Sequence, residues 1–184
     1  MRLEIRIAGF GGQGVVLAGY VLGKALALYS DREAVMTQSH GPEARGGASS
    51  ADLVVSTEPI AYPFVQQPDY LVALSQESYT KFRPTIKPEA MVLIDQDLVN
   101  PQDGDQIHAI PATQLAEDLG RRIVTNVVML GFVTKLTGIV TPEAMVSALE
   151  DTLNPRILDL NINAFNAGLE YQASQNKQPE PEKS

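Results

Sequence analysis

Two glycine-rich segments carry the residue types and spacing that could do chemistry. The first reads Gly9-Phe10-Gly11-Gly12-Gln13-Gly14, with glycines at the G-x-G-x-x-G spacing of dinucleotide-binding loops. Such glycines permit a tight turn, and the N–H groups at the start of a following helix attract an anion. Gly11, Gly12, Gln13 and Gly14 are therefore candidates for contact with a phosphate-bearing group or a partner subunit. The structural alternative is a close strand–helix turn without a ligand.

The second segment, His40–Gly47, holds three glycines and a proline. Arg45 could clamp a phosphate or a carboxylate through two N–H bonds. Glu43 could pair with Arg45 instead, and Gly46 and Gly47 would let a partner's backbone come close. We take His40, Glu43, Arg45, Gly46 and Gly47 as a candidate interface, against the alternative of a solvated loop with a local ion pair. For His40 we favour a structural hydrogen bond over acid–base work.

Two common phosphate-binding sites do not fit the first segment. The dinucleotide site needs an acid at the end of the second strand, where this chain reads Gln38-Ser39-His40; Asp31 and Glu33 come earlier. A Walker loop needs Lys and Ser or Thr after the last glycine, but Val15 and Val16 follow it. An ordinary NAD, FAD or Walker-type site is therefore disfavoured.

The composition narrows the chemistry further. The 184 residues include no cysteine and two histidines, and the net charge is -8. Cysteine-held iron–sulfur clusters and zinc sites are excluded, and we expect no metal and no catalytic residue on this chain. Nucleic-acid binding is disfavoured because Arg121-Arg122 is the nearest approach to a basic patch. Glu4 and Arg6 interrupt any apolar leader, so we expect a cytoplasmic protein that does not enter membranes.

The predicted strands and helices that must position these segments alternate early in the chain, and helices predominate late in the chain. We expect an α/β fold: one Rossmann-like domain over residues 1–174, with a mostly parallel sheet flanked by helices, a helical C-terminal part, and a disordered tail over 175–184. Expected strands are Leu3–Gly9, Glu33–Gln38, Ser50–Ser56, Tyr70–Ser75, Ala90–Asp95 and Ile107–Ile110. Expected helices are Val15–Tyr29, Gln76–Phe82, Ala112–Leu119, Asn126–Leu136, Thr141–Leu153 and Arg156–Ser174.

For some further residues we prefer a structural role to a functional one. The nearly all-apolar strand Tyr70–Ser75 is expected at the centre of the sheet. Asp95 and Asp97 end a strand, where a helix or turn cap is favoured over a ligand. His108 lies in an apolar strand and is expected at the edge of the core. In a parallel sheet, both glycine-rich segments would share the edge at which α/β folds bind ligands.

The two segments together resemble the gamma subunit of 2-oxoacid:ferredoxin (acceptor) oxidoreductases. The resemblance rests on Gly9–Val16 and Ser39–Ser49 and continues through Ile60–Pro63, Pro68-Asp69, Leu71–Glu77, Tyr79–Phe82, Val92–Asp95 and Asn126–Gly131. It implies a subunit of a complex that oxidatively decarboxylates a 2-oxoacid with coenzyme A and reduces ferredoxin. The sequence at Tyr62-Pro63 and Ser75-Gln76-Glu77 is most similar to the 2-oxoglutarate branch of the family. Pyruvate and branched-chain enzymes share the fold.

The resemblance also implies which subunits of the complex hold its cofactors. Thiamine diphosphate and the iron–sulfur clusters would lie on partner subunits, namely alpha, beta and a delta or ferredoxin-like chain, and this chain would bind no cofactor tightly. Gly11, Gly12, Gln13, Gly14 and Arg45 would face either coenzyme A or a partner subunit. Two alternatives stay open, a stand-alone Rossmann-type nucleotide-binding oxidoreductase and a scaffold without ligand contact.

Overall fold

The computed structural model describes residues 1–39 and 47–172. His40, Glu43, Arg45 and Gly46 lie outside the described residues, and so does the tail from residue 173 onward. The predictions made for these residues therefore stay predictions. Gly47 is described, and it is half-buried.

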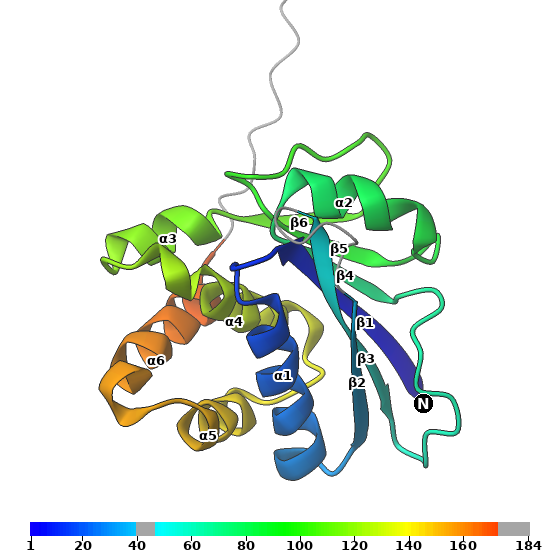
Figure 1. Ribbon diagram of the computed structural model, residues 1–184, viewed down its shortest axis with the longest axis horizontal. Helices are drawn as coiled ribbons and strands as arrows, with labels where there is room; N and C mark the ends of the chain where they lie inside the picture. The colour runs from blue at the N-terminus through cyan, green and yellow to red at the C-terminus, as the bar shows by residue number, and fades with distance from the viewer. Residues whose placement is uncertain (40–46, 173–184) are drawn as a thin grey trace, which may run out of the picture.

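A mixed six-stranded sheet forms the centre of the described structure (Figure 1), in the order β2-β3-β1-β4-β5-β6. The strands are β1 (Arg2–Phe10), β2 (Glu33–Ser39), β3 (Ala48–Ser56), β4 (Tyr70–Ala73), β5 (Met91–Asp95) and β6 (Ile107–Ile110). β1, β4, β5 and β6 pair in parallel, whereas β3 lies antiparallel between β1 and β2. Five strands therefore point the same way. The α/β class and the mostly parallel sheet are confirmed, and so is the central position of β4.

Helices cover both faces of this sheet. They are α1 (Val15–Tyr29), α2 (Gln76–Phe82), α3 (Ala112–Asp118), α4 (Thr125–Thr137), α5 (Pro142–Thr152) and α6 (Pro155–Glu170), with short 3₁₀ turns η1 (Arg83–Thr85) and η2 (Arg122–Val124). The larger core cluster joins α1, α4 and α5 to one face, and α2 packs on the other through Tyr79 and Phe82. Within the described ranges, no helix is long and apolar enough to cross a membrane.

Three predicted boundaries differ from the structure by two residues or more, and the first is the start of β3, which begins at Ala48 and not at Ser50. β4 ends at Ala73, not at Ser75, because the Ser75 hydroxyl caps α2 by accepting from the amide of Ser78 at 3.2 Å. The last helix ends at Glu170, not at Ser174, since Tyr171 already has an extended backbone with ψ of 123°. The predicted start at Thr141 is confirmed, because its hydroxyl accepts from the amide of Ala144 at 3.2 Å.

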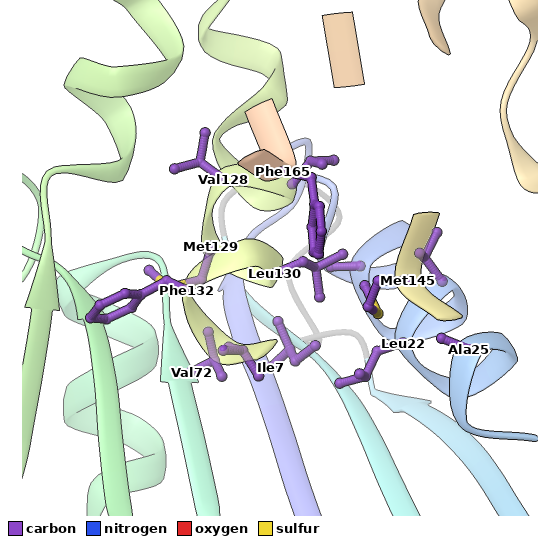
Figure 2. Packing of buried hydrophobic residues seen from close by; sticks show 14 of the residues in the cluster. Ile7, Leu22, Ala25, Val72, Val128, Met129, Leu130, Phe132, Met145 and Phe165 are labelled. Carbon is purple, nitrogen blue, oxygen red and sulfur yellow. The ribbon is translucent and has the colours of Figure 1, made fainter. Parts of the chain in front are cut away.

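Helix α4 is the structural link between the sheet and the outer helix α6. Its residues from Thr125 to Thr134 are all buried, as its continuous apolar sequence predicts. Leu130 of α4 and Phe165 of α6 lie side by side in the core, next to Met145 of α5 (Figure 2). The two helices pack so closely that a Cβ added at Gly168 would lie 1.8 Å from the carbonyl oxygen of Val128. Glycine at this position therefore sets the distance between α4 and α6.

Candidate functional site at the glycine turn

The first glycine segment forms a tight turn between β1 and α1. Gly12 and Gly14 have φ of 96° and 70°, a backbone region that other residues rarely adopt. The amide of Gln13 donates to the carbonyl of Phe10 at 3.2 Å, and the Gln13 side-chain oxygen accepts from the amide of Phe10 at 2.7 Å. The Gln13 side-chain nitrogen donates to the carbonyl of Leu74 at 2.8 Å. The side chain of Gln13 therefore fixes the turn from within.

Asn126, at the start of α4, holds the last glycine of the turn. Its side-chain nitrogen donates to the carbonyl of Gly14 at 3.1 Å, and the same carbonyl accepts from the amide of Ala18 at 2.9 Å. A Cβ at Gly14 would lie 2.3 Å from that nitrogen. Sequence reasoning placed Asn126 in a buried helix without giving it a role. A polar amide in an otherwise apolar helix was the available signal.

The opposite side of the turn is open. A Cβ built at Gly11 or Gly12 would meet no atom within 4 Å among the described residues. Beside the turn lies a hollow of about 270 Å³, lined by Gly12, Gln13, Thr113, Arg122, Ile123 and Thr125. The first amides of α1 face this edge, and the partial positive charge of a helix N-terminus favours an anion there.

Arg122 brings a full positive charge to this hollow. Its side chain is 63% exposed and lies 3.7 Å from a carboxylate oxygen of Glu117, a loose surface pair. Ile123, beside it, is 75% exposed, and Phe10 at the turn is 38% exposed. Sequence reasoning set Arg121-Arg122 aside as too small for a nucleic-acid patch and missed its place beside the turn. The edge thus combines anion-binding groups with exposed apolar side chains, as a ligand or subunit contact requires.

Both glycine-rich segments start from this same edge of the sheet. Phe10 pairs with Ala48, and Ser39 pairs with Ser50, so the described residues flanking 40–46 lie beside the glycine turn. The Ser49 hydroxyl also donates to the carbonyl of Gly9 at 3.2 Å. The predicted shared edge is therefore confirmed at both ends of the second segment.

Asp95 and Asp97 have structural roles, as expected. Asp95 is fully buried and accepts from the Thr113 amide at 3.1 Å and the Thr113 hydroxyl at 2.6 Å. Burial raises the pKa of Asp95, although the hydrogen bonds from Thr113 act in the opposite direction. Asp97 accepts from the amide of Gln114 at 3.2 Å, so both carboxylates act as caps. His108 is half-buried on the edge strand β6.

Metal binding finds no support in the described part of the chain. No group of three or more His, Asp or Glu side chains there is arranged to hold a metal ion. The turn also lacks the acid of a dinucleotide site, because β2 ends in Gln38 and Ser39; in addition, β3 stands between β1 and β2. With strands about 4.8 Å apart, the end of β2 is displaced by one strand, to about 10 Å from β1.

A mixed α/β sheet with a glycine turn open at its ligand edge defines a class of α/β domain that is suited to contact a ligand or a partner there. Comparison with known proteins makes this class specific. The family model for pyruvate ferredoxin/flavodoxin oxidoreductase matches residues 4–171, and the chain belongs to this family. The recognition made from the two glycine segments is therefore confirmed.

Individual relatives refine the comparison. The 2-oxoglutarate synthase subunit KorC of Methanocaldococcus jannaschii is 49% identical over 175 residues, covering 92% of this chain and 94% of the relative. The crystal structure of a keto/oxoacid ferredoxin oxidoreductase gamma subunit from Geobacter sulfurreducens matches with a TM-score of 0.85 at 39% identity, covering 92% and 95% of the two chains. The ketoisovalerate oxidoreductase subunit VorA of Methanothermobacter thermautotrophicus is 34% identical, but the match covers only 36% of its length.

Proposed function

We propose that this chain is the gamma subunit of a thiamine diphosphate-dependent 2-oxoacid:ferredoxin oxidoreductase that converts 2-oxoglutarate to its acyl-coenzyme A. The observation that carries the proposal is the 49% identity to a 2-oxoglutarate synthase subunit along almost the whole of both chains. Identity to the pyruvate synthase subunit PorC of Methanothermobacter marburgensis is 34%. We therefore propose 2-oxoglutarate as the substrate, because the identity to the 2-oxoglutarate synthase subunit is higher than the identity to the pyruvate synthase subunit.

The residues of this chain support a non-catalytic role in such a complex. Without cysteine it supplies no thiolate for an iron–sulfur cluster. Asp95 and Asp97, two acids at the end of β5, are engaged as caps. We accordingly assign thiamine diphosphate and the clusters to alpha, beta and delta or ferredoxin-like partner subunits. This chain would close part of the coenzyme A cavity of the complex and stabilise the assembly.

Coenzyme A is the ligand that we propose for the glycine turn. Its thiol takes up the acyl group, and its diphosphate and 3′-phosphate require N–H and guanidinium donors. The open side of Gly11 and Gly12, the start of α1 and the Arg122 side chain offer such donors. Arg45 would add a second guanidinium. Gln13 would support the turn instead of contacting the ligand, because its backbone amide donates to Phe10 and its side-chain amide bonds to Phe10 and Leu74.

The test uses the complex purified from its native cell without oxygen, through a tag on this chain. We expect thiamine- and cluster-bearing partners, and coenzyme A-dependent viologen reduction that is fastest with 2-oxoglutarate among 2-oxoglutarate, pyruvate and branched 2-oxoacids. Purification of the chain alone, under conditions that keep other complexes whole, would contradict the proposal. Faster reduction with another 2-oxoacid would contradict the substrate alone.

A second measurement separates ligand contact from assembly. Loss of one charge-assisted hydrogen bond to phosphate should raise the apparent KM for coenzyme A roughly tenfold in Arg45→Ala, with the complex intact. Arg156→Ala, which removes an exposed arginine from α6, is the matched control and should leave this KM unchanged. If Arg45→Ala prevents assembly instead, the second segment is a docking loop and not a ligand clamp.

A further inference from the structure

A run of seven apolar residues lies on the surface at the opposite end of the sheet. Pro59-Ile60-Ala61-Tyr62-Pro63-Phe64-Val65 joins β3 to β4 and contains no charged side chain. Tyr62 is 49% exposed and Phe64 is 53% exposed, and their rings meet edge to face with centroids 5.5 Å apart. Consecutive exposed apolar residues reduce solubility, so a soluble domain keeps them where they have a function.

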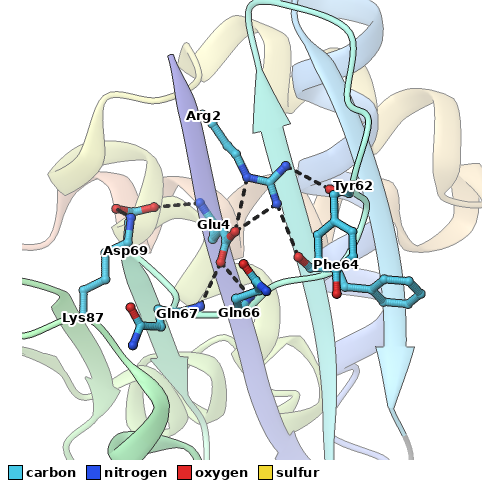
Figure 3. A network of polar contacts seen from close by, with 8 residues as sticks. All are labelled: Arg2, Glu4, Tyr62, Phe64, Gln66, Gln67, Asp69 and Lys87. Atoms are coloured by element: carbon cyan, nitrogen blue, oxygen red, sulfur yellow. Dashed lines mark hydrogen bonds and ion pairs between the residues drawn. The ribbon is translucent and has the colours of Figure 1, made fainter.

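A network of polar contacts around the buried Glu4 fixes this loop in place (Figure 3). The guanidinium of Arg2 donates to the carbonyl of Tyr62 at 2.9 Å and to the carbonyl of Phe64 at 3.3 Å. Arg2 is itself held by Glu4, which is only 7% exposed, at 2.9 Å. The other carboxylate oxygen of Glu4 accepts from the amides of Gln66 and Gln67 at 2.7 and 2.9 Å. The middle of the loop and the residues that follow it are thus tied to the first residues of β1.

The network makes the aromatic pair a preformed anchor. A loop that is already ordered loses little conformational entropy on binding, and aromatic side chains dominate the energy of protein interfaces. Arg2 and Glu58 beside the loop supply the polar rim typical of such a surface. We propose that the Pro59–Val65 loop docks a permanent partner subunit of the complex, an inference that rests on the proposed function.

The apolar character of the loop selects this occupant. Permanent subunit interfaces are hydrophobic, whereas brief encounters with electron carriers use small surfaces steered by charge. A second copy bound through this loop alone would have seven residues a side, against about 20–30 in a stable interface. A partner subunit can add contacts at other surfaces. The VorA relative, of which this chain matches 36%, shows that the domain can occur within a much longer polypeptide.

The test places a photo-crosslinking phenylalanine analogue at position 64 in the tagged chain and isolates the complex after illumination. We expect a crosslink to a non-identical subunit. In parallel, partner retention is measured in 0.5 M NaCl, which screens ionic contacts but does not weaken apolar ones. Under these conditions the double variant Tyr62→Ser/Phe64→Ser should retain about tenfold less partner subunit than the wild type, or still less. The matched control is Leu28→Ser/Ile157→Ser, which removes two exposed apolar side chains from α1 and α6 and should retain partners as the wild type does.

The outcomes separate this inference from the proposed function. If the wild-type chain brings no partner subunits, both fail. If it brings active partners but the double variant retains as many, only the docking surface is wrong. A crosslink between two copies of this chain, or equal loss of partners in the control variant, would also overturn it. Far-UV circular dichroism of both variants, expected to match the wild type, excludes unfolding as the cause of loss.

Discussion

Replacement of Gly14 by alanine tests the way in which the glycine turn is held. Gly14 has φ of 70°, and its added Cβ would lie 2.3 Å from the side-chain nitrogen of Asn126. Alanine in this left-handed conformation costs about 1–2 kcal/mol. The displaced amide of Asn126, only 3% exposed, then loses its bond to the Gly14 carbonyl, which costs about 1–3 kcal/mol more. Gly14→Ala should therefore lower the free energy of unfolding by about 2–5 kcal/mol.

A double-mutant cycle separates these two contributions. In Asn126→Ala the Gly14 carbonyl keeps its bond from the amide of Ala18, so this change alone should cost only about 1–2 kcal/mol. It also removes the atom that the new Cβ would meet. In that background Gly14→Ala should cost about 1–2 kcal/mol, the backbone contribution alone. The double variant should thus be about 1–3 kcal/mol more stable than the sum of the single changes predicts.

Urea unfolding of the full chain, followed by far-UV circular dichroism, measures the cycle; tryptophan fluorescence is excluded because the sequence has no tryptophan. Gly120→Ala is the matched control, since Gly120 has φ of 88° and its added Cβ would meet nothing within 4 Å. It should cost about 1–2 kcal/mol with or without Asn126. Additivity of Gly14→Ala and Asn126→Ala within about 0.5 kcal/mol would refute the reasoning.

Two further predictions concern the scaffold. Gly168→Ala should lower the free energy of unfolding by about 3 kcal/mol or more, because its Cβ would lie 1.8 Å from the Val128 carbonyl oxygen; Gly23→Ala, 3.3 Å from a side-chain atom, should change it by less than about 1 kcal/mol in urea unfolding. Burial raises the pKa of Asp105, but hydrogen bonds from Arg83 and Tyr79 outweigh it and hold that pKa below its usual value. The ionised Asp105 should therefore stabilise the fold above about pH 4, and this stabilisation should be lost as pH falls through the lowered pKa. Asp105→Asn should flatten the fall in melting temperature below pH 4, and an unchanged profile of melting temperature against pH would contradict this.

Local patterns were sufficient to predict most elements of the fold. The helices Val15–Tyr29 and Gln76–Phe82 and the strand Ile107–Ile110 have the bounds expected from apolar spacing and flanking residues. The glycine turn is also where the sequence places it. These features depend on neighbours in the chain, so they can be predicted without knowledge of the tertiary structure. Two of the three larger boundary errors occurred where a cap or a non-helical residue ended an element earlier than hydrophobicity suggested, and the third was the early start of β3.

The composition of the site could not be predicted in the same way, because it depends on contacts distant in sequence. Asn126 reaches a carbonyl 112 residues away. Arg122 lines the hollow because η2 and α4 place it there, which no spacing around Gly14 indicates. The Gln13 side chain was proposed to face a ligand or subunit, but its bond to Leu74 spans 61 residues. Only the packed structure shows that this amide is engaged internally.

The position of β3 explains why a dinucleotide-like motif occurs without a dinucleotide site. In dinucleotide-binding folds the second strand lies directly beside the first, so its terminal acid reaches the ribose of a nucleotide held at the glycine turn. Here an antiparallel strand occupies that place, and Ser49 at its start bonds to the carbonyl of Gly9. The strand beside the glycine turn therefore does not present a terminal acid as a parallel second strand would. The open turn, Arg122 and the exposed apolar residues beside it are consistent with the contact that we propose with coenzyme A or a neighbouring subunit.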